Sequence, residues 1–120
     1  ENLVIANVSQ DEIAVVKTHG TGTHSNNLAE RNALQSSLNG FVATSLKPKI
    51  GHTMGVSGLL ETCLLLDSTK QGIVPKIENR TEKDDIFLSE DREFKGGVIL
   101  SLAAGMGNVY SSALFDTRMA

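Results

Sequence analysis

The sequence predicts an α/β domain with a mixed, mostly parallel sheet that is flanked by helices and ends in an antiparallel strand pair. Two observations carry this prediction. An apolar, strand-like run is twice followed by a loop rich in Gly and Thr and then by a helical pattern, which is the order of parallel β-α units. Near the C-terminus, two strand-like runs are separated only by the short segment 105–108, and so short a connection favours antiparallel pairing.

The first unit begins with Ile13–Lys17, an apolar run typical of a buried strand covered on both faces. His19 follows at the start of a Gly-Thr loop. Asn26 or Asn27 can cap the next helix, and Gly40 is expected to end it.

The second unit begins with a strand at Phe41–Ser45. Pro48 cannot donate a backbone hydrogen bond, so Lys47–Thr53 is expected to be an ordered loop rather than a helix. A helix then runs from near Val56 to Gly72. Its leucines form a stripe too broad for a surface helix, and we expect burial on most of its circumference, partly against elements outside this chain.

The remaining elements are a polar connection and the final strand pair. Glu82–Lys95 is interpreted as a charged, solvated loop with a few apolar anchors: Ile86, Phe87, Leu88 and Phe94. Glu61 is likewise interpreted as a solvated charge. Val98–Ala103 and Val109–Phe115 are expected to form the antiparallel pair.

Composition limits the classes of function. A chain of 120 residues with 40% hydrophobic content can bury one core, so residues 1–120 are expected to form a single domain. The net charge of −3 and the lack of a basic cluster argue against a nucleic-acid partner. No apolar run is long enough for a membrane span, which favours a cytoplasmic protein. One cysteine and three histidines show no metal-binding spacing, so no metal is expected.

Two histidines in matching loops are the candidate chemical groups. The pKa of imidazole lies near neutral pH, so His19 and His52 can donate hydrogen bonds or exchange protons. Lys47 and Glu30 carry opposite charges and are expected to pair beneath the site. Cys63 lies within a leucine run and is interpreted as a buried structural thiol rather than a nucleophile.

These residues form two long motifs. The first is HGTGT at 19–23 with Glu30 downstream, and the second is S-x-K-x-x-x-G-H-T at 45–53. Both resemble the signatures of the β-ketoacyl synthases, condensing enzymes of the thiolase-like superfamily that act in fatty-acid and polyketide synthesis. A third signature, a Gly-Phe-Gly-Gly-type loop, is kept in part at 105–108. The resemblance spans Ile13 to Phe115 and corresponds to the C-terminal half of such an enzyme.

The resemblance implies a thiolase-like half-fold and an acyltransferase activity, the decarboxylative condensation of malonyl with acyl groups. His19 and His52 are then expected to stabilise the malonyl enolate, with Lys47 and Glu30 supporting them. Other residues are expected to contact the pantetheine arm or the acyl pocket: Thr21, Thr23, Gly105, Met106 and Gly107. No cofactor is implied beyond the phosphopantetheine of the acyl carrier protein that carries the substrates.

The resemblance also implies partners. They are acyl carrier protein with acyl and malonyl thioesters, an N-terminal half that holds the nucleophilic cysteine and is absent here, and a second subunit in a homo- or heterodimer. Without that cysteine, the chain alone is expected to be inactive in condensation.

Two alternatives remain open. A non-catalytic partner subunit of the chain-length-factor type is favoured by Asn27, which replaces the usual aspartate, and by the altered loop at 105–108. The retained His19, His52 and Lys47 argue against it. A thiolase that uses coenzyme A thioesters is disfavoured, because the paired motifs resemble the decarboxylating branch of the superfamily.

Overall fold

A computed structural model of the chain describes residues 7–20, 24–51, 56–81, 84–105 and 109–119. Three helices and six strands, with two short 3-10 turns, occur in these ranges. In chain order they are η1 (Gln10–Glu12), β1 (Ile13–Lys17), α2 (His24–Ser37), β2 (Val42–Thr44), α3 (Lys47–Ile50), α4 (Ser57–Lys70), β3 (Ile73–Val74), β4 (Arg92–Glu93), β5 (Val98–Gly105), β6 (Val109–Asp116) and η3 (Thr117–Met119).

The main sheet has four strands in the order β2-β1-β5-β6. The central strand β1 is parallel to both β2 and β5, and β5 pairs with β6 in antiparallel fashion along its whole length. A second, two-stranded sheet joins β3 and β4. The predicted mixed sheet with a final antiparallel pair is therefore confirmed.

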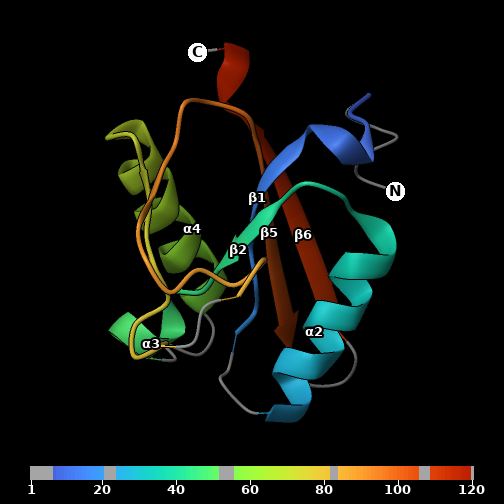
Figure 1. Cartoon of the computed structure of the whole chain (residues 1–120), viewed down its shortest axis with the longest axis vertical. Helices are drawn as coiled ribbons and strands as arrows, with labels where there is room; N and C mark the ends of the chain where they lie inside the picture. Colours follow the sequence, from blue (N-terminus) through green and yellow to red (C-terminus); the bar gives the residue numbers. More distant parts are fainter. Residues whose placement is uncertain (1–6, 21–23, 52–55, 82–83, 106–108, 120) are drawn as a thin grey trace.

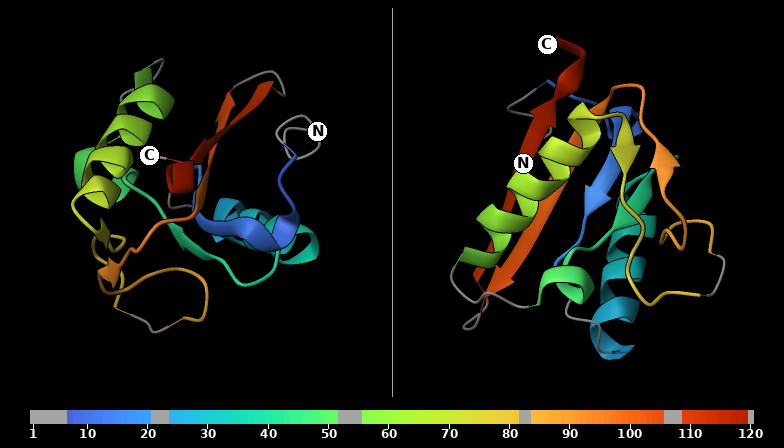
Figure 2. Two further views of the ribbon diagram at one scale, coloured as in Figure 1. Left: turned by 90° about the horizontal axis from the view of Figure 1, so that it is seen from above. Right: turned by 90° about the vertical axis from the view of Figure 1, so that its left-hand side faces the viewer.

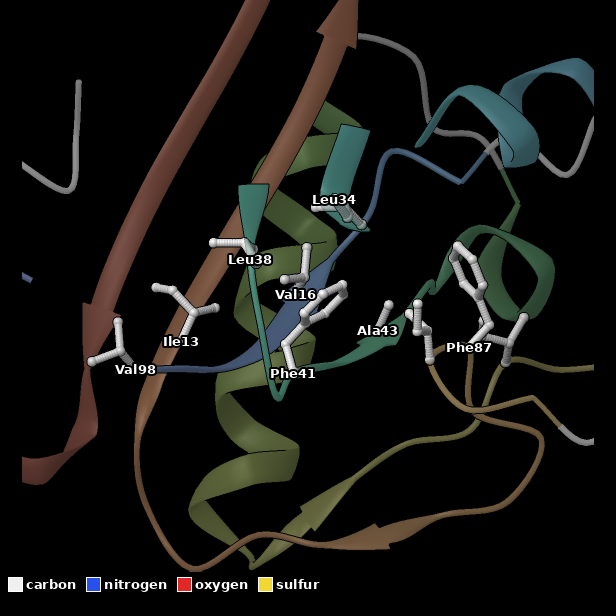
Figure 3. Close-up of a cluster of buried hydrophobic side chains, with 10 residues drawn as sticks. Ile13, Val16, Leu34, Leu38, Phe41, Ala43, Phe87 and Val98 are labelled. Atoms are coloured by element: carbon white, nitrogen blue, oxygen red, sulfur yellow. The ribbon is translucent and has the colours of Figure 1, made fainter. Parts of the chain in front are cut away.

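Helices α2 and α4 lie on opposite faces of the main sheet (Figure 1 and Figure 2). Successive side chains of a strand point to opposite faces, and β1 supplies both cores in this way. Val16 packs in one cluster with Leu34 and other side chains (Figure 3). Val15 packs in the other with Leu65 of α4. Each helix thus covers a separate apolar layer.

Helix α4 turns a narrow stripe toward the sheet. Its buried residues recur every four positions: Ser57, Glu61, Leu65 and Thr69. Leu59, Leu60 and Leu64 are exposed, Leu59 to 71%, while Leu66 is half-buried against the core. The expectation that α4 is buried on most of its circumference is therefore wrong for this chain. Cys63 is also exposed rather than buried.

The one-turn helix α3 corrects the prediction of a loop at Lys47–Thr53. Pro48 lies in its first turn, where a helix makes no use of the backbone N–H that proline lacks. The turn ends at Gly51, whose φ of 81° is in the left-handed region and whose N–H donates to the carbonyl of Lys47 at 2.7 Å.

The charged segment after β3 is anchored as expected. Ile86, Phe87 and Leu88 are buried, and Phe87 forms a parallel bridge with Ala43 of β2. Asp84 pairs with two arginines of the surrounding structure, Arg31 and Arg80.

The one-sided burial of α4 generates a stability prediction. Leu65→Ala removes a side chain with no exposed surface and should lower the free energy of unfolding by about 2–5 kcal/mol. The matched Leu59→Ala should lower it by less than about 0.5 kcal/mol, because surface substitutions cost little. Urea denaturation of both variants at low protein concentration measures the difference. Equal losses would contradict the assigned orientation of α4.

Candidate functional site

His19 lies just past β1, at the carboxyl ends of the parallel strands, where the sites of open α/β sheets gather. The strand ladder continues to Thr18, whose N–H donates to the carbonyl of Thr44 at 3.0 Å. From the end of β5, the N–H of Ala104 donates to Nδ1 of His19 at 3.2 Å. A backbone N–H can only donate, so Nδ1 accepts and a neutral ring carries its proton on Nε2. His19 is thereby set to act as a donor through Nε2.

The loop after His19 is held from two sides. Gly20 has a φ of 57°, and a Cβ there would lie 2.0 Å from Oγ of Ser45. Ser45 donates from Oγ to the carbonyl of Gly20 at 3.2 Å. The N–H of Gly20 donates to Oε1 of Glu30 at 2.9 Å. Glycine is therefore required at position 20, and the two sequence motifs meet there.

Beneath this loop lies a buried ion cluster, which we call the Lys17–Glu61–Lys47 cluster. Oε1 of Glu61 is 3.1 Å from Nζ of Lys17, and Oε2 is 3.0 Å from Nζ of Lys47. The side chains of Lys17 and Glu61 have no exposed surface, and that of Lys47 is 5% exposed. Ser57 also donates a hydrogen bond to Oε2 of Glu61. Two ammonium groups thus share one carboxylate, away from water.

Lys47 connects this cluster to His19. Its Nζ donates to the backbone carbonyl of His19 at 2.5 Å. We expected Lys47 to pair with Glu30, but in the described part of the chain its salt bridge is with Glu61. The interpretation of Glu61 as a solvated charge is wrong, because this side chain is fully buried.

Burial and hydrogen bonding oppose each other at Glu61. Burial raises the pKa of Glu61, but the hydrogen bonds from Ser57, Lys47 and Lys17 outweigh it and leave the pKa below the ordinary value of 4.5. Burial lowers the pKa of Lys17, and the attraction of Glu61 offsets this only in part. Glu61 is therefore the ionised centre of the cluster at neutral pH.

Sequence reasoning missed Lys17, Glu61 and the amide of Ala104. A signal for the first two was present. Lys17 ends an otherwise apolar buried strand, and a buried charge needs a partner. An acidic residue within the leucine-rich helix was the natural candidate. The role of a backbone amide has no such signal.

Several expected site residues lie outside the described part of the chain, and the structure does not place them: Thr21, Thr23, His52, Met106 and Gly107. Gly105 ends β5 next to Ala104, which puts the start of that loop beside His19. In the described ranges, no helix is long and apolar enough to cross a membrane.

The sequence was also compared with models of known protein families. Residues 2–81 match the family model described as the beta-ketoacyl synthase, C-terminal domain. The chain belongs to this family. Both sequence motifs, at 19–23 and 45–53, lie within the matched residues, so the resemblance found in the sequence is confirmed.

Similar proteins of known description include a polyketide synthase subunit and an orsellinic acid synthase. The tetracenomycin polyketide synthase ketoacyl synthase alpha subunit of Streptomyces glaucescens is 29% identical over 87% of this chain and 26% of its own length. The orsellinic acid synthase of Beauveria bassiana is 40% identical over 57% of this chain and 3% of its own length. The chain therefore spans only a small part of these relatives.

Solved structures share the fold. The ishigamide ketosynthase/chain length factor superposes on 96% of this chain and 30% of its own with a TM-score of 0.85 and 24% identity. The ketosynthase from module 1 of the bacillaene synthase of Bacillus amyloliquefaciens covers 96% of this chain and 25% of its own, with a TM-score of 0.80 and 17% identity. The half-fold expected from the sequence is thus confirmed.

The ion cluster generates a prediction about stability. Glu61→Gln keeps the side-chain shape but leaves two buried ammonium groups without their carboxylate. The free energy of unfolding at pH 7 should fall by about 3–5 kcal/mol. Glu90→Gln, the same change at an exposed position, should alter it by less than about 0.5 kcal/mol.

The same variants test the pH dependence. A carboxylate whose pKa is lowered on folding contributes stability above its unfolded pKa, and this contribution is lost as the pH falls through the folded value. The wild-type chain should therefore lose stability as the pH drops below 4.5, and Glu61→Gln should lose less over the same range. Parallel curves for the two proteins would contradict the assignment of Glu61 as an ionised group.

Proposed function

We propose that this chain is the C-terminal half of a β-ketoacyl-acyl-carrier-protein synthase and supplies the histidine pair for decarboxylative condensation. One observation carries the proposal. His19, in the first family motif, accepts the N–H of Ala104 at Nδ1 and so presents Nε2–H as a fixed donor. Relatives described as polyketide synthases support polyketide synthesis as the setting, and fatty-acid synthesis uses the same chemistry.

In this reaction His19 acts on the malonyl thioester. Its Nε2–H donates to the thioester oxygen while the bond between the α-carbon and the carboxylate breaks and carbon dioxide leaves. The electron pair of that bond becomes the enolate, whose negative charge resides on the oxygen that His19 contacts. A donor fixed in advance at such an oxygen contributes about 3 kcal/mol to lowering the barrier. The enolate carbon then attacks the carbonyl carbon of the acyl thioester, so that a carbon–carbon bond forms, the carbon–sulfur bond breaks and the cysteine sulfur leaves as a thiolate.

Other residues hold this donor in place. Lys47 fixes the carbonyl of His19, and Ser45 and Glu30 fix Gly20 immediately after it. These are positioning contacts around the reacting group, of the kind that orients ligands at enzyme sites. His52, in the second motif, is proposed as the second donor on the strength of the sequence.

The proposal includes partners that this chain does not contain. The acyl group is held on a cysteine of an N-terminal half, and both substrates arrive on acyl carrier protein. The outward leucines of α4, among them Leu59, support a further protein layer over this helix. One similar structure is described as a ketosynthase/chain length factor, which supports a dimer.

A non-catalytic subunit of the chain-length-factor type is the second candidate. The loop at 105–108, where Met106 and Asn108 depart from the family signature, favours it. Such a subunit would retain the fold but would not decarboxylate malonyl groups.

The test uses the full-length protein and separates two half-reactions. His19→Ala should reduce release of carbon dioxide from malonyl-acyl-carrier protein by about 100-fold or more, while transfer of an acyl group to the protein stays measurable. The third histidine, His24, lies outside both motifs; His24→Ala serves as the matched control and should keep both half-reactions.

The other outcomes are informative. Equal loss of both half-reactions in His19→Ala would assign His19 a structural role. A wild-type protein that releases no carbon dioxide would overturn the catalytic proposal and favour the non-catalytic subunit.

A further inference from the structure

Lys17 is a fully buried cation that the proposed reaction does not use. It is the largest fully buried side chain in the described part of the chain. Lys47 alone would neutralise Glu61, since its Nζ lies within 3.2 Å of both carboxylate oxygens. The presence of a second ammonium group at 3.1 Å from Oε1 therefore needs another explanation.

The position of Lys17 follows from strand geometry. Side chains two residues apart on a strand share a face, so Lys17 lies on the same face as Val15, which packs with Leu65 of α4. Its neighbours in sheet register are Thr44 of β2 and Ser101 of β5, both uncharged. The ammonium group thus lies under α4. Lys17 itself stands two residues before His19.

The charged groups around Lys17 come from three elements. Helix α4 supplies Glu61 in direct contact, α3 supplies Lys47 as a repelling charge, and α2 supplies Glu30 as a weaker attraction. Burial lowers the pKa of Lys17, so its charge is more easily lost than that of an ordinary lysine. While both lysines are protonated, the Lys17–Glu61–Lys47 cluster carries one surplus positive charge.

We propose that Lys17 is a positioning residue for the enolate-stabilising loop at His19. Its positive charge offsets part of the charge of Glu61. Lys47 and the adjoining His19 loop are therefore left with a surplus positive potential that favours the enolate. The proposal rests on the proposed function. The physical link is short, because Nζ of Lys47 is 2.5 Å from the carbonyl of His19. In a buried environment such a charge is weakly screened, and it stabilises negative charge that develops nearby. The charge therefore stabilises the negative charge that develops on the oxygen at His19 during decarboxylation.

The experiment compares Lys17→Met and Lys17→Arg in the full-length protein. Methionine matches the uncharged stem of the lysine side chain and leaves Glu61 and Lys47 as a neutral pair. Arginine keeps the positive charge at all accessible pH values. In Lys17→Met, kcat for malonyl decarboxylation should fall about tenfold. KM and the rate of acyl transfer should stay within about twofold of the wild type, since the charge acts on the enolate.

The pH profile is a readout that a merely structural role would not change. In the wild type, decarboxylation should decline as the pH rises through the lowered pKa of Lys17. In Lys17→Arg this decline should be absent and the decarboxylation rate should stay close to the wild-type maximum. In Lys17→Met the decline should also be absent, but the rate should be low at every pH. A decline that appears in all three proteins would come from a group other than Lys17.

Each remaining outcome overturns the inference. If wild type and Lys17→Met have the same kcat, or if Lys17→Met loses acyl transfer and urea stability together with decarboxylation, Lys17 has no positioning role. Should Lys17→Met not fold, an unchanged pH profile in Lys17→Arg overturns the proposal. Failure of the proposed function is distinct, because the wild type would then release no carbon dioxide.

Discussion

The arrangement of the site depends on one buried carboxylate. Glu61 brings together Lys17 from the central strand and Lys47 from α3, and Lys47 in turn holds the carbonyl of His19. Desolvating three charges is costly, and only close mutual contacts offset that cost. The α2 face of the sheet is an ordinary apolar core. The α4 face combines an apolar end with this ionic end, which lies directly under the proposed reaction centre.

The order of elements was readable from the sequence because strand and helix periods are local properties. The apolar run Ile13–Lys17 is a strand with the expected bounds, and β5 and β6 form the expected antiparallel pair. The site was readable in part. The motifs indicated that His19, Glu30 and Lys47 share one neighbourhood, and Glu30 and Lys47 both contact the backbone of the His19–Gly20 loop.

The sequence did not show which face of a helix packs against the sheet. A helical pattern shows which residues share a face, but the outward leucines of α4 gave a stronger signal than the buried stripe of Ser57, Glu61 and Thr69. Cys63 was misjudged for the same reason. The partner of Lys47 depends on this packing, and the proton on His19 depends on a backbone amide that no side-chain pattern encodes.

The topology of the sheet bears on how the chain folds. The central strand β1 lies between β2 and β5, and the contact that orients His19 joins residues 85 positions apart. Pairings of such long range form slowly, because the intervening chain loses much entropy before the contact is made. During synthesis β1 cannot pair with β5 until most of the chain has left the ribosome. The edge of β1 that later pairs with β5 therefore stays unpaired, and open to wrong pairing, for much of that time.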